Sequence, residues 1–462
     1  MTNDKSRVSF TILALVQSTL IFTIALIMIP MPKIANDFAL SSSQLLLLQV
    51  AYGLPFSGLL LFGGRLADRY RGLRMFVIGL IVFGASSLFA AFSPSFEILV
   101  SMRFLQGIGG ALIAPAAMAV LRVLFPDPAA FGRAMAIWGG VSVLGSIVGF
   151  VASGILTTWI SWRWMFGVPI LVAIIGLAAA RWLLPADRSE NTSNRPGLDP
   201  LGAILATLGI VFTSYGLIAV EDHSWTSAVV WGPLVAGLVL LASFLLVENK
   251  VRDALLPPGF LLDRYRSIGL LGMLLAAATS ALIQFVLSLY LQQIRNWSPF
   301  STAIGFLPFA VTLIATNLAA PALVGRFGAR MVTIAGFILA AVGWGLLAGI
   351  DHDTAYASGL LPGQIILGAS ISLIFSGAAV LSTVNVPEHQ TGLAGGVMNT
   401  AMELGPTVGL AILMSVASIQ AEVVRGYASA FGTAGVFFVV AAVITIVLFR
   451  RSPVVAEKSA NS

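Results

Sequence analysis

The sequence consists of long apolar runs separated by short polar segments. Of its 462 residues, 58% are hydrophobic and 10% are charged, whereas a soluble domain carries about 25% charged residues. A helix that crosses the hydrocarbon core of a bilayer needs about 20 consecutive, predominantly apolar residues. Runs of this length lie near residues 9–31, 44–64, 73–92, 97–122, 132–156, 163–184, 200–220, 227–247, 267–291, 301–324, 330–350, 358–381, 391–418 and 430–449. The sequence therefore predicts an all-α polytopic membrane protein with fourteen transmembrane helices.

The basic residues predict how these helices are oriented, because cytoplasmic loops carry an excess of Lys and Arg. With a cytoplasmic N-terminus, 20 of the 25 Lys and Arg residues fall in cytoplasmic segments, four fall in outer loops, and Arg103 lies within a helix. We therefore expect a multi-pass protein of the cytoplasmic membrane with both termini in the cytoplasm. The first run is long enough to span, so we expect a retained helix rather than a cleaved signal peptide.

Two polar loops predict the domain organisation. Residues 186–200 and 248–266 are charged, contain prolines, and bracket two of the apolar runs. We expect an N-terminal six-helix bundle (1–185), linkers with two inserted helices (186–266), a C-terminal six-helix bundle (267–450) and a cytoplasmic tail (451–462). The segments GGRLADRYRGLRMF (63–76) and LVGRFGARMV (323–332) follow corresponding helices of the two bundles. This weak repeat indicates duplicated halves, which are typical of transporters.

The composition argues against several other classes of protein. The net charge of +6 comes from basic residues scattered over short loops, so we expect no nucleic-acid partner. The chain has no cysteine and only three histidines, which are far apart in the sequence. No nucleotide-binding glycine loop or nucleophile–histidine arrangement is present. We therefore expect neither an enzyme nor a protein that holds a metal or another cofactor.

Arg103 is a basic residue inside the fourth apolar run. It shares one helical face with Gln106, Gly107 and Gly110. An intramembrane charge seldom faces lipid, so this small polar face predicts packing beside a wet cavity. The alternative is an arginine whose head group reaches the outer membrane surface.

Glu403 is the acidic counterpart. Of the 19 Asp and Glu residues, 18 map to loops, tails or helix ends, but Glu403 lies about 18 Å along its helix from Thr391, within a hydrocarbon layer about 30 Å thick. It shares a stripe with Asn399 and Thr407, and Pro406 leaves the Met402 carbonyl without a helical donor. Glu403 could be a protonation site that Arg103 tunes, a direct ligand of a cationic substrate, or a permanently protonated structural residue.

Other polar residues in the apolar runs are candidates for contact with a substrate. For any single one of them, hydrogen bonding between helices is the simpler explanation. The candidates are Thr23, Gln49, Tyr52, Gln106, Gln284, Asn317 and Asn399.

Two motifs resemble those of a known family. GGRLADRYRGLR matches the loop 2–3 motif of the major facilitator superfamily at Gly64, Leu66, Asp68 and Arg69, and RFLQGIGGA matches its helix 4 motif at Arg103, Gln106, Gly107 and Gly109. The chain resembles the fourteen-helix drug:proton antiporters of that superfamily over nearly its whole length.

The resemblance implies a secondary transporter that works by alternating access. It would export small amphipathic organic compounds in exchange for protons, function as a monomer, and use the proton gradient rather than a cofactor. In the gating motif, Gly64 would permit close helix approach and Asp68 would latch onto the N-terminus of helix 13. Arg69 and Arg74 would add ion pairs that break when the cytoplasmic side opens.

The chain also departs from the family pattern. Thr23 stands where the family usually has an acid in helix 1, and Ser146 and Phe150 stand where prolines are common in helix 5. Glu403 is an acid where the family usually has none. We expect Glu403 to replace the missing acid of helix 1. An importer or uniporter on the same scaffold is the alternative that these departures leave open.

Overall fold

The computed structural model describes most of the chain and consists of helices and the loops that join them. The described residues are 3–127, 134, 149, 152–154, 156–184, 197–220, 222–251, 254–256, 258–384, 386 and 391–450. Within them the assigned elements are helical. The prediction of an all-α polytopic membrane protein is confirmed.

The helices follow the apolar runs, because a backbone in lipid must satisfy its own hydrogen bonds. The first half contains α1 (Asn3–Leu26), α2 (Met31–Phe38), α3 (Ser42–Val50), α4 (Gly53–Tyr70), α5 (Gly72–Ala91), α6 (Phe96–Leu124) and α8 (Gly167–Trp182). The inserted helices are α9 (Pro200–Ala219) and α10 (Ala228–Glu248). The second half contains α11 (Arg264–Leu289), α12 (Pro299–Gly305), α13 (Leu307–Leu347), α14 (Leu361–Thr383), α15 (Thr391–Leu404), α16 (Leu410–Ala417) and α17 (Val423–Arg450).

Short turns of tighter or wider helix join some of these elements. The 3₁₀ turns are η1 (Trp162–Phe166) and η3 (Pro258–Leu262), and the π-helical turns are η4 (Tyr290–Ile294), η5 (Tyr356–Leu360) and η7 (Gly405–Gly409). Turn η7 contains Pro406, which lacks the N–H that a regular α-helix would use at this position. The helix that carries Glu403 is therefore interrupted between α15 and α16.

Twelve helical segments in the described ranges are long and apolar enough to cross a membrane. One of them, Pro299–Leu347, contains 49 residues and covers two predicted helices, 301–324 and 330–350. The backbone breaks at Gly328, whose φ of 79° lies in the left-handed region that glycine adopts readily. The predicted helix at 132–156 lies mostly outside the described residues. The count of fourteen is therefore supported only approximately.

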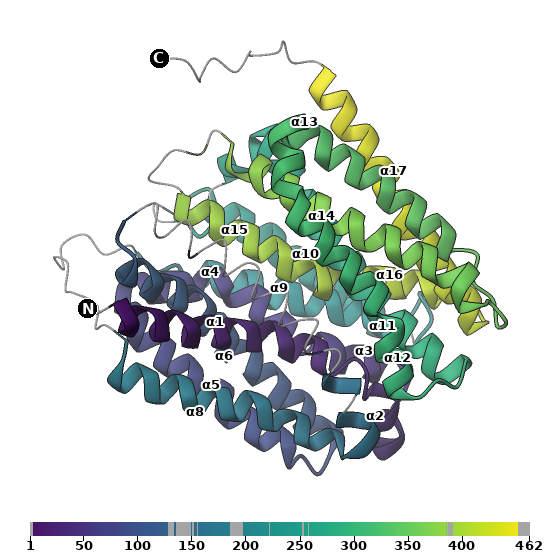
Figure 1. Ribbon diagram of the computed structural model, residues 1–462, viewed down its shortest axis with the longest axis horizontal. Coiled ribbons are helices and arrows are strands. Elements are labelled where there is room, and N and C mark those ends of the chain that lie inside the picture. The colour runs from purple at the N-terminus through teal and green to yellow at the C-terminus, as the bar shows by residue number, and fades with distance from the viewer. Residues whose placement is uncertain are drawn as a thin grey trace.

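The helices gather in two groups that follow the chain order. In Figure 1, the purple to teal helices α1, α4, α5, α6 and α8 lie together on one side, and the green to yellow helices α11 and α13–α17 lie on the other. Helix α4 packs against α15, so the two groups meet at this pair. The domain boundaries given above stay a prediction.

The inserted helix α9 lies at the junction between the two groups. It packs against α4 of the first group, α16 of the second group, and its partner α10. The hydroxyl of Ser415 in α16 donates a hydrogen bond of 2.7 Å to the Leu217 carbonyl in α9. The insert thus contacts both halves rather than standing apart from them.

The close helix approach that the loop 2–3 motif predicts lies one residue before the expected position. A Cβ atom at Gly63 would lie 3.0 Å from the carbonyl carbon of Ala111 in α6 and still closer to its oxygen. A Cβ atom at Gly64 would meet only the Pro115 side chain, at an ordinary 3.7 Å. The expectation for Gly64 was therefore wrong, since Gly63 faces the α6 backbone.

We expect Gly63→Ala to lower the thermal stability of the detergent-solubilised protein. Because the added methyl group would collide with the α6 backbone, the loss should be about 1–3 kcal/mol. Tryptophan fluorescence during heating measures this loss. Gly64→Ala is the matched control, and it should leave stability unchanged or raise it by up to about 1 kcal/mol. Equal losses in the two variants would contradict this account of the α4–α6 contact.

Candidate functional site

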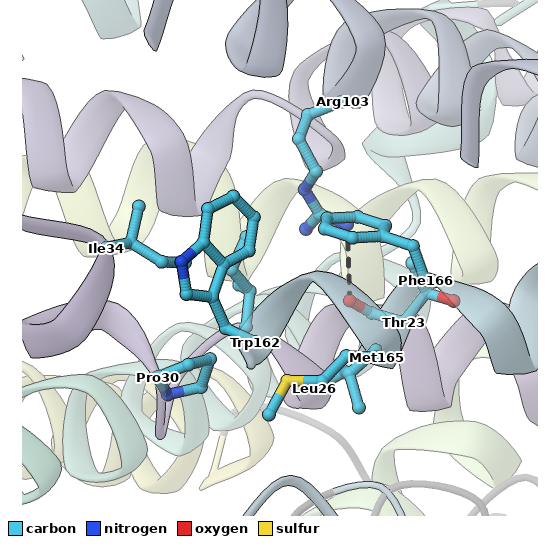
Figure 2. Close-up of a pocket in the computed structure, with 9 residues that line it drawn as sticks. Thr23, Leu26, Pro30, Ile34, Arg103, Trp162, Met165 and Phe166 are labelled. Carbon is cyan, nitrogen blue, oxygen red and sulfur yellow. Dashed lines mark hydrogen bonds between the residues drawn. The ribbon is translucent and has the colours of Figure 1, made fainter. Parts of the chain in front are cut away.

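The buried arginine in α6 is the centre of the candidate site. Arg103 is 1% exposed, and its Nη1 donates to the Thr23 carbonyl at 3.3 Å and to Gln106 Oε1 at 3.1 Å. Figure 2 shows its side chain pointing toward Thr23, with the first of these bonds drawn as a dashed line. The guanidinium is enclosed by protein, so the alternative of a head group at the outer surface does not hold.

A chain of polar groups continues from Arg103 into the first helix group. Gln106 Nε2 donates to the Ser87 hydroxyl of α5 at 2.7 Å, and this hydroxyl donates to the Phe83 carbonyl at 2.6 Å. The Tyr52 ring lies 5.1 Å from the guanidinium carbon, within the range of a cation–π contact. Sequence reasoning missed Ser87, which reads as one small residue in an apolar run.

The positive charge of Arg103 is met by dipoles and an aromatic ring. In the described part of the chain, none of the ion pairs includes Arg103, and its Nε is buried without a hydrogen-bond partner. A charge enclosed in this way needs compensation or a functional reason. The guanidinium of Arg103 can therefore still donate a hydrogen bond to a further acceptor or pair with a negative charge.

A small pocket lies beside Arg103. Its volume is about 10 Å³, enough for about one water molecule and far below the roughly 300–1,000 Å³ of a typical small-molecule site. It is lined by Thr23, Leu26, Ile27, Pro30, Ile34, Arg103, Trp162, Met165 and Phe166. One cation in an apolar lining suits an amphipathic compound, but this conformation has no room for one of drug size.

The aromatic wall of this pocket comes from turn η1. Trp162 and Phe166 enter it from the segment SWRWMF, and the Trp162 indole donates to Asp37 at 2.8 Å. Arg163 stacks on Trp162 at 4.3 Å and approaches Asp37 at 3.7 Å. These contacts tie η1 to α2, which the sequence alone did not predict.

The predicted substrate contacts separate into two sets. Thr23, Tyr52 and Gln106 converge on Arg103. Gln49 on α3 is buried, and among the described residues its Oε1 has no hydrogen-bond partner. The others lie on helices of the second half and are not among the hydrogen-bond partners of Arg103. They are Gln284 on α11, which donates to Ser280, half-buried Asn317 on α13, and exposed Asn399 on α15.

Glu403 is the second-last residue of α15, two residues before the start of turn η7. The position of its side chain is outside what the structure describes. Thr407 in η7 is buried and faces Gly53 at the start of α4, so this part of the helix lies where the two groups meet. The pairing of Glu403 with Arg103 stays a prediction.

The gating motif lies at the end of α4 that is expected to face the cytoplasm. Asp68 is exposed, and its carboxyl group is close enough to Arg122 of α6 and Arg65 of its own helix to feel their charges. Arg69 lies beside the Tyr70 ring at 5.9 Å, and Arg74 is exposed on α5. The side chains of residues 391–396 are not described, so the latch between Asp68 and helix 13 stays a prediction.

At the opposite end of the helices, hydrogen bonds join the two halves. The last carbonyls of a helix lack intrahelical donors, and those after α1 are satisfied by side chains from elsewhere. Ser288 of α11 donates to the Met28 carbonyl at 3.4 Å, and Gln292 of η4 donates to the Ile29 carbonyl at 3.1 Å. These bonds hold the two groups together at the predicted outer side.

Two groups of apolar helices that meet along a buried polar seam define a polytopic membrane protein of the carrier type. The family can be named from the sequence comparison. The chain belongs to the Major Facilitator Superfamily, whose family model matches residues 11–262 and 269–462.

Several relatives are similar over most of their length. The puromycin resistance protein pur8 of Streptomyces alboniger is 35% identical over 403 residues, covering 84% of this chain and 77% of that protein. The cephamycin export protein CmcT of Amycolatopsis lactamdurans is 32% identical over 437 residues, covering 93% and 89%. The crystal structure of the human organic anion transporter MFSD10 shares the fold, with a TM-score of 0.64 at 16% identity, covering 95% and 99%.

We expect Arg103→Met to fold and to lose transport by about tenfold or more. Methionine fills similar space without a buried charge, but it cannot donate to the Thr23 carbonyl and to Gln106 Oε1, and hydrogen bonds to a charged group contribute about 1.5–3 kcal/mol each. Uptake of small amphipathic compounds by everted vesicles and heating of the purified protein measure the two effects. Arg181→Met, at an exposed site in the last turn of α8, is the control. A large loss of thermal stability in Arg103→Met would reveal a purely structural arginine.

Proposed function

We propose that the protein is a secondary transporter that exports small amphipathic organic compounds in exchange for protons. The observation that carries this proposal is its similarity, over 93% of this chain and 89% of the relative, to a protein named as a cephamycin exporter. Relatives named for resistance to puromycin and lincomycin support the same class of cargo. The amphipathic lining of the pocket at Arg103 fits such compounds.

Transport would proceed by alternating access, in which the two helix groups move against each other around a central site. The small volume of the Arg103 pocket corresponds to a closed conformation of the transporter. To admit a compound from the cytoplasm, α4 and α15 would separate. To release it, the hydrogen bonds from Ser288 and Gln292 to the carbonyls after α1 would break.

Proton coupling would use Glu403. A carboxyl group gains a proton when it is buried and loses it when it is exposed to water. The break at η7 brings irregular backbone close to this carboxyl group. Arg103 would favour the ionised form of this carboxyl if the two approach each other. Direct binding of a cationic substrate and a structural role are the competing explanations for Glu403.

An importer or uniporter on the same scaffold is the second candidate. It is favoured by Thr23, which stands where the family usually has an acid and offers Arg103 only its main-chain carbonyl. Everted vesicles discriminate the two functions, because an exporter loads them when the lumen is acidified and an importer does not.

We expect Glu403→Gln to abolish the stimulation of puromycin uptake into everted vesicles by an imposed pH gradient. The amide cannot exchange a proton, so uptake should be the same with and without the gradient. Glu422→Gln is the control, because Glu422 lies at an exposed site beside His352 and Arg425, where pairs contribute little.

Unchanged pH dependence in Glu403→Gln would exclude this residue as the coupling site. If Glu403→Gln still takes up neutral compounds without a gradient and loses only the uptake of cationic compounds, Glu403 is instead a ligand of the substrate.

A further inference from the structure

Two buried acids lie where the inserted helices begin and end. Asp199 caps the N-terminus of α9, where its Oδ1 accepts a hydrogen bond of 2.8 Å from the Gly202 N–H. Glu248 is the last residue of α10, and its Oε2 accepts a hydrogen bond of 2.9 Å from the Leu256 N–H. The two residues are 4% and 2% exposed. One oxygen of each carboxyl group is thereby satisfied.

The two remaining oxygens face each other without a donor. Asp199 Oδ2 and Glu248 Oε1 are buried, and neither has a hydrogen-bond partner in the described part of the chain. A methyl group on Gly202 would lie 2.9 Å from Glu248 Oε1 and closer still to Asp199 Oδ2. The carboxyl groups are within hydrogen-bonding reach of each other. Two ionised carboxylates at this separation would repel each other in a site closed to water.

We propose that Asp199 and Glu248 share one proton and form a proton-binding site at the cytoplasmic ends of the two inserted helices. A single O–H donor between Glu248 Oε1 and Asp199 Oδ2 satisfies both unpartnered oxygens. The pair then carries one negative charge instead of two.

The positions of the two acids on their helices assign the proton to Glu248. A helix N-terminus favours a negative charge and a helix C-terminus disfavours it. Asp199 lies at the N-terminus of α9, and Glu248 lies at the C-terminus of α10. The O–H of Glu248 therefore donates, and Asp199 accepts as the carboxylate.

The surroundings favour a proton over a metal ion or a basic side chain. Calcium takes six to eight oxygen ligands, and this site offers two free ones. The elements packed on α9 are α3, α4, α10, α16 and η7. Apart from Glu248 itself, their ionisable side chains are Arg65, Asp68, Arg69 and Tyr70 of α4. Lys250, in the loop after α10, is exposed.

This pair is linked to the gating motif through one loop. Glu248 holds the loop at the Leu256 N–H, and Arg65 of α4 donates a hydrogen bond of 2.7 Å to the Ala254 carbonyl of the same loop. Arg65 also lies near Asp68. Loss of the shared proton would separate the ends of α9 and α10 and shift the loop that Arg65 holds. The inserted helices would thus sense cytoplasmic pH independently of Glu403 and of the cargo.

The test uses substitutions that supply the missing hydrogen-bond donor without a titratable proton. In Glu248→Gln and in Asp199→Asn, the carbonyl keeps the backbone hydrogen bond and the amide NH₂ donates to the other acid. We expect the melting temperature of the wild-type protein to fall by about 2 °C or more as the pH rises and the pair loses its proton. Each single variant should keep its melting temperature over the same pH range.

The double variant and an infrared measurement make the test specific. With Asp199→Asn and Glu248→Gln together, two NH₂ groups face each other. The melting temperature of the double variant should therefore fall by more than the sum of the changes in the two single variants. The carbonyl band of a protonated carboxyl group, measured on the full-length protein in lipid, should weaken in either single variant and in the wild type at high pH. Glu97→Gln, at an exposed acid at the start of α6, should leave the band unchanged.

Three results would overturn the proposal. One is a carboxyl band that neither single variant alters, and another is a double variant as stable as the singles. The third is a melting temperature that rises with added Mg²⁺ or Ca²⁺ in the wild type but not in Glu248→Gln, which would assign the pair to a metal ion. None of these readouts depends on transport, so they are independent of the proposed efflux.

Discussion

The cost of enclosing a charge in an apolar core governs the arrangement of the first helix group. The guanidinium of Arg103 needs acceptors wherever it is buried, and it obtains them from the Thr23 carbonyl, the Gln106 side chain and the Tyr52 ring. These groups belong to α1, to α6 and to the start of α4, so one side chain fixes the mutual position of three helices. The hydrogen bond from Gln106 to Ser87 adds α5 to the same network. The pocket beside Arg103 is a product of this arrangement.

Hydropathy predicted the helices well, because each apolar run must satisfy its backbone within itself wherever lipid surrounds it. The contacts between helices could not be predicted in the same way. Trp162 reaches the pocket only because its turn η1 packs on α5 and α8 and its indole bonds Asp37 of α2, and Ser87 meets Gln106 only because α5 packs on α6. The separation of Asp199 from Glu248 in the sequence gave no sign that their carboxyl groups meet. Charge alone marked Arg103 and Glu403, and it could not say what either one touches.

The two inserted helices are tied to both halves of the molecule. The polar linkers mark the insert in the sequence but do not show what it contacts, and in the structure α9 packs on α4 and accepts a hydrogen bond from Ser415 of α16. The loop after α10 accepts a hydrogen bond from Arg65 of the gating motif. A motion that separates α4 from the second half therefore has to carry α9 along or slide past it. In either case the inserted helices take part in the movement.

The bonds that join the halves beyond the end of α1 have one further property. Their acceptors are the main-chain carbonyls of Met28 and Ile29, which every amino acid possesses. The side chains along this stretch can therefore diverge among descendants of the protein without loosening the seal, and Ile27 and Pro30, which border the pocket, lie within it. Evolution can reshape the cavity for new compounds while the closure of the two halves is inherited unchanged.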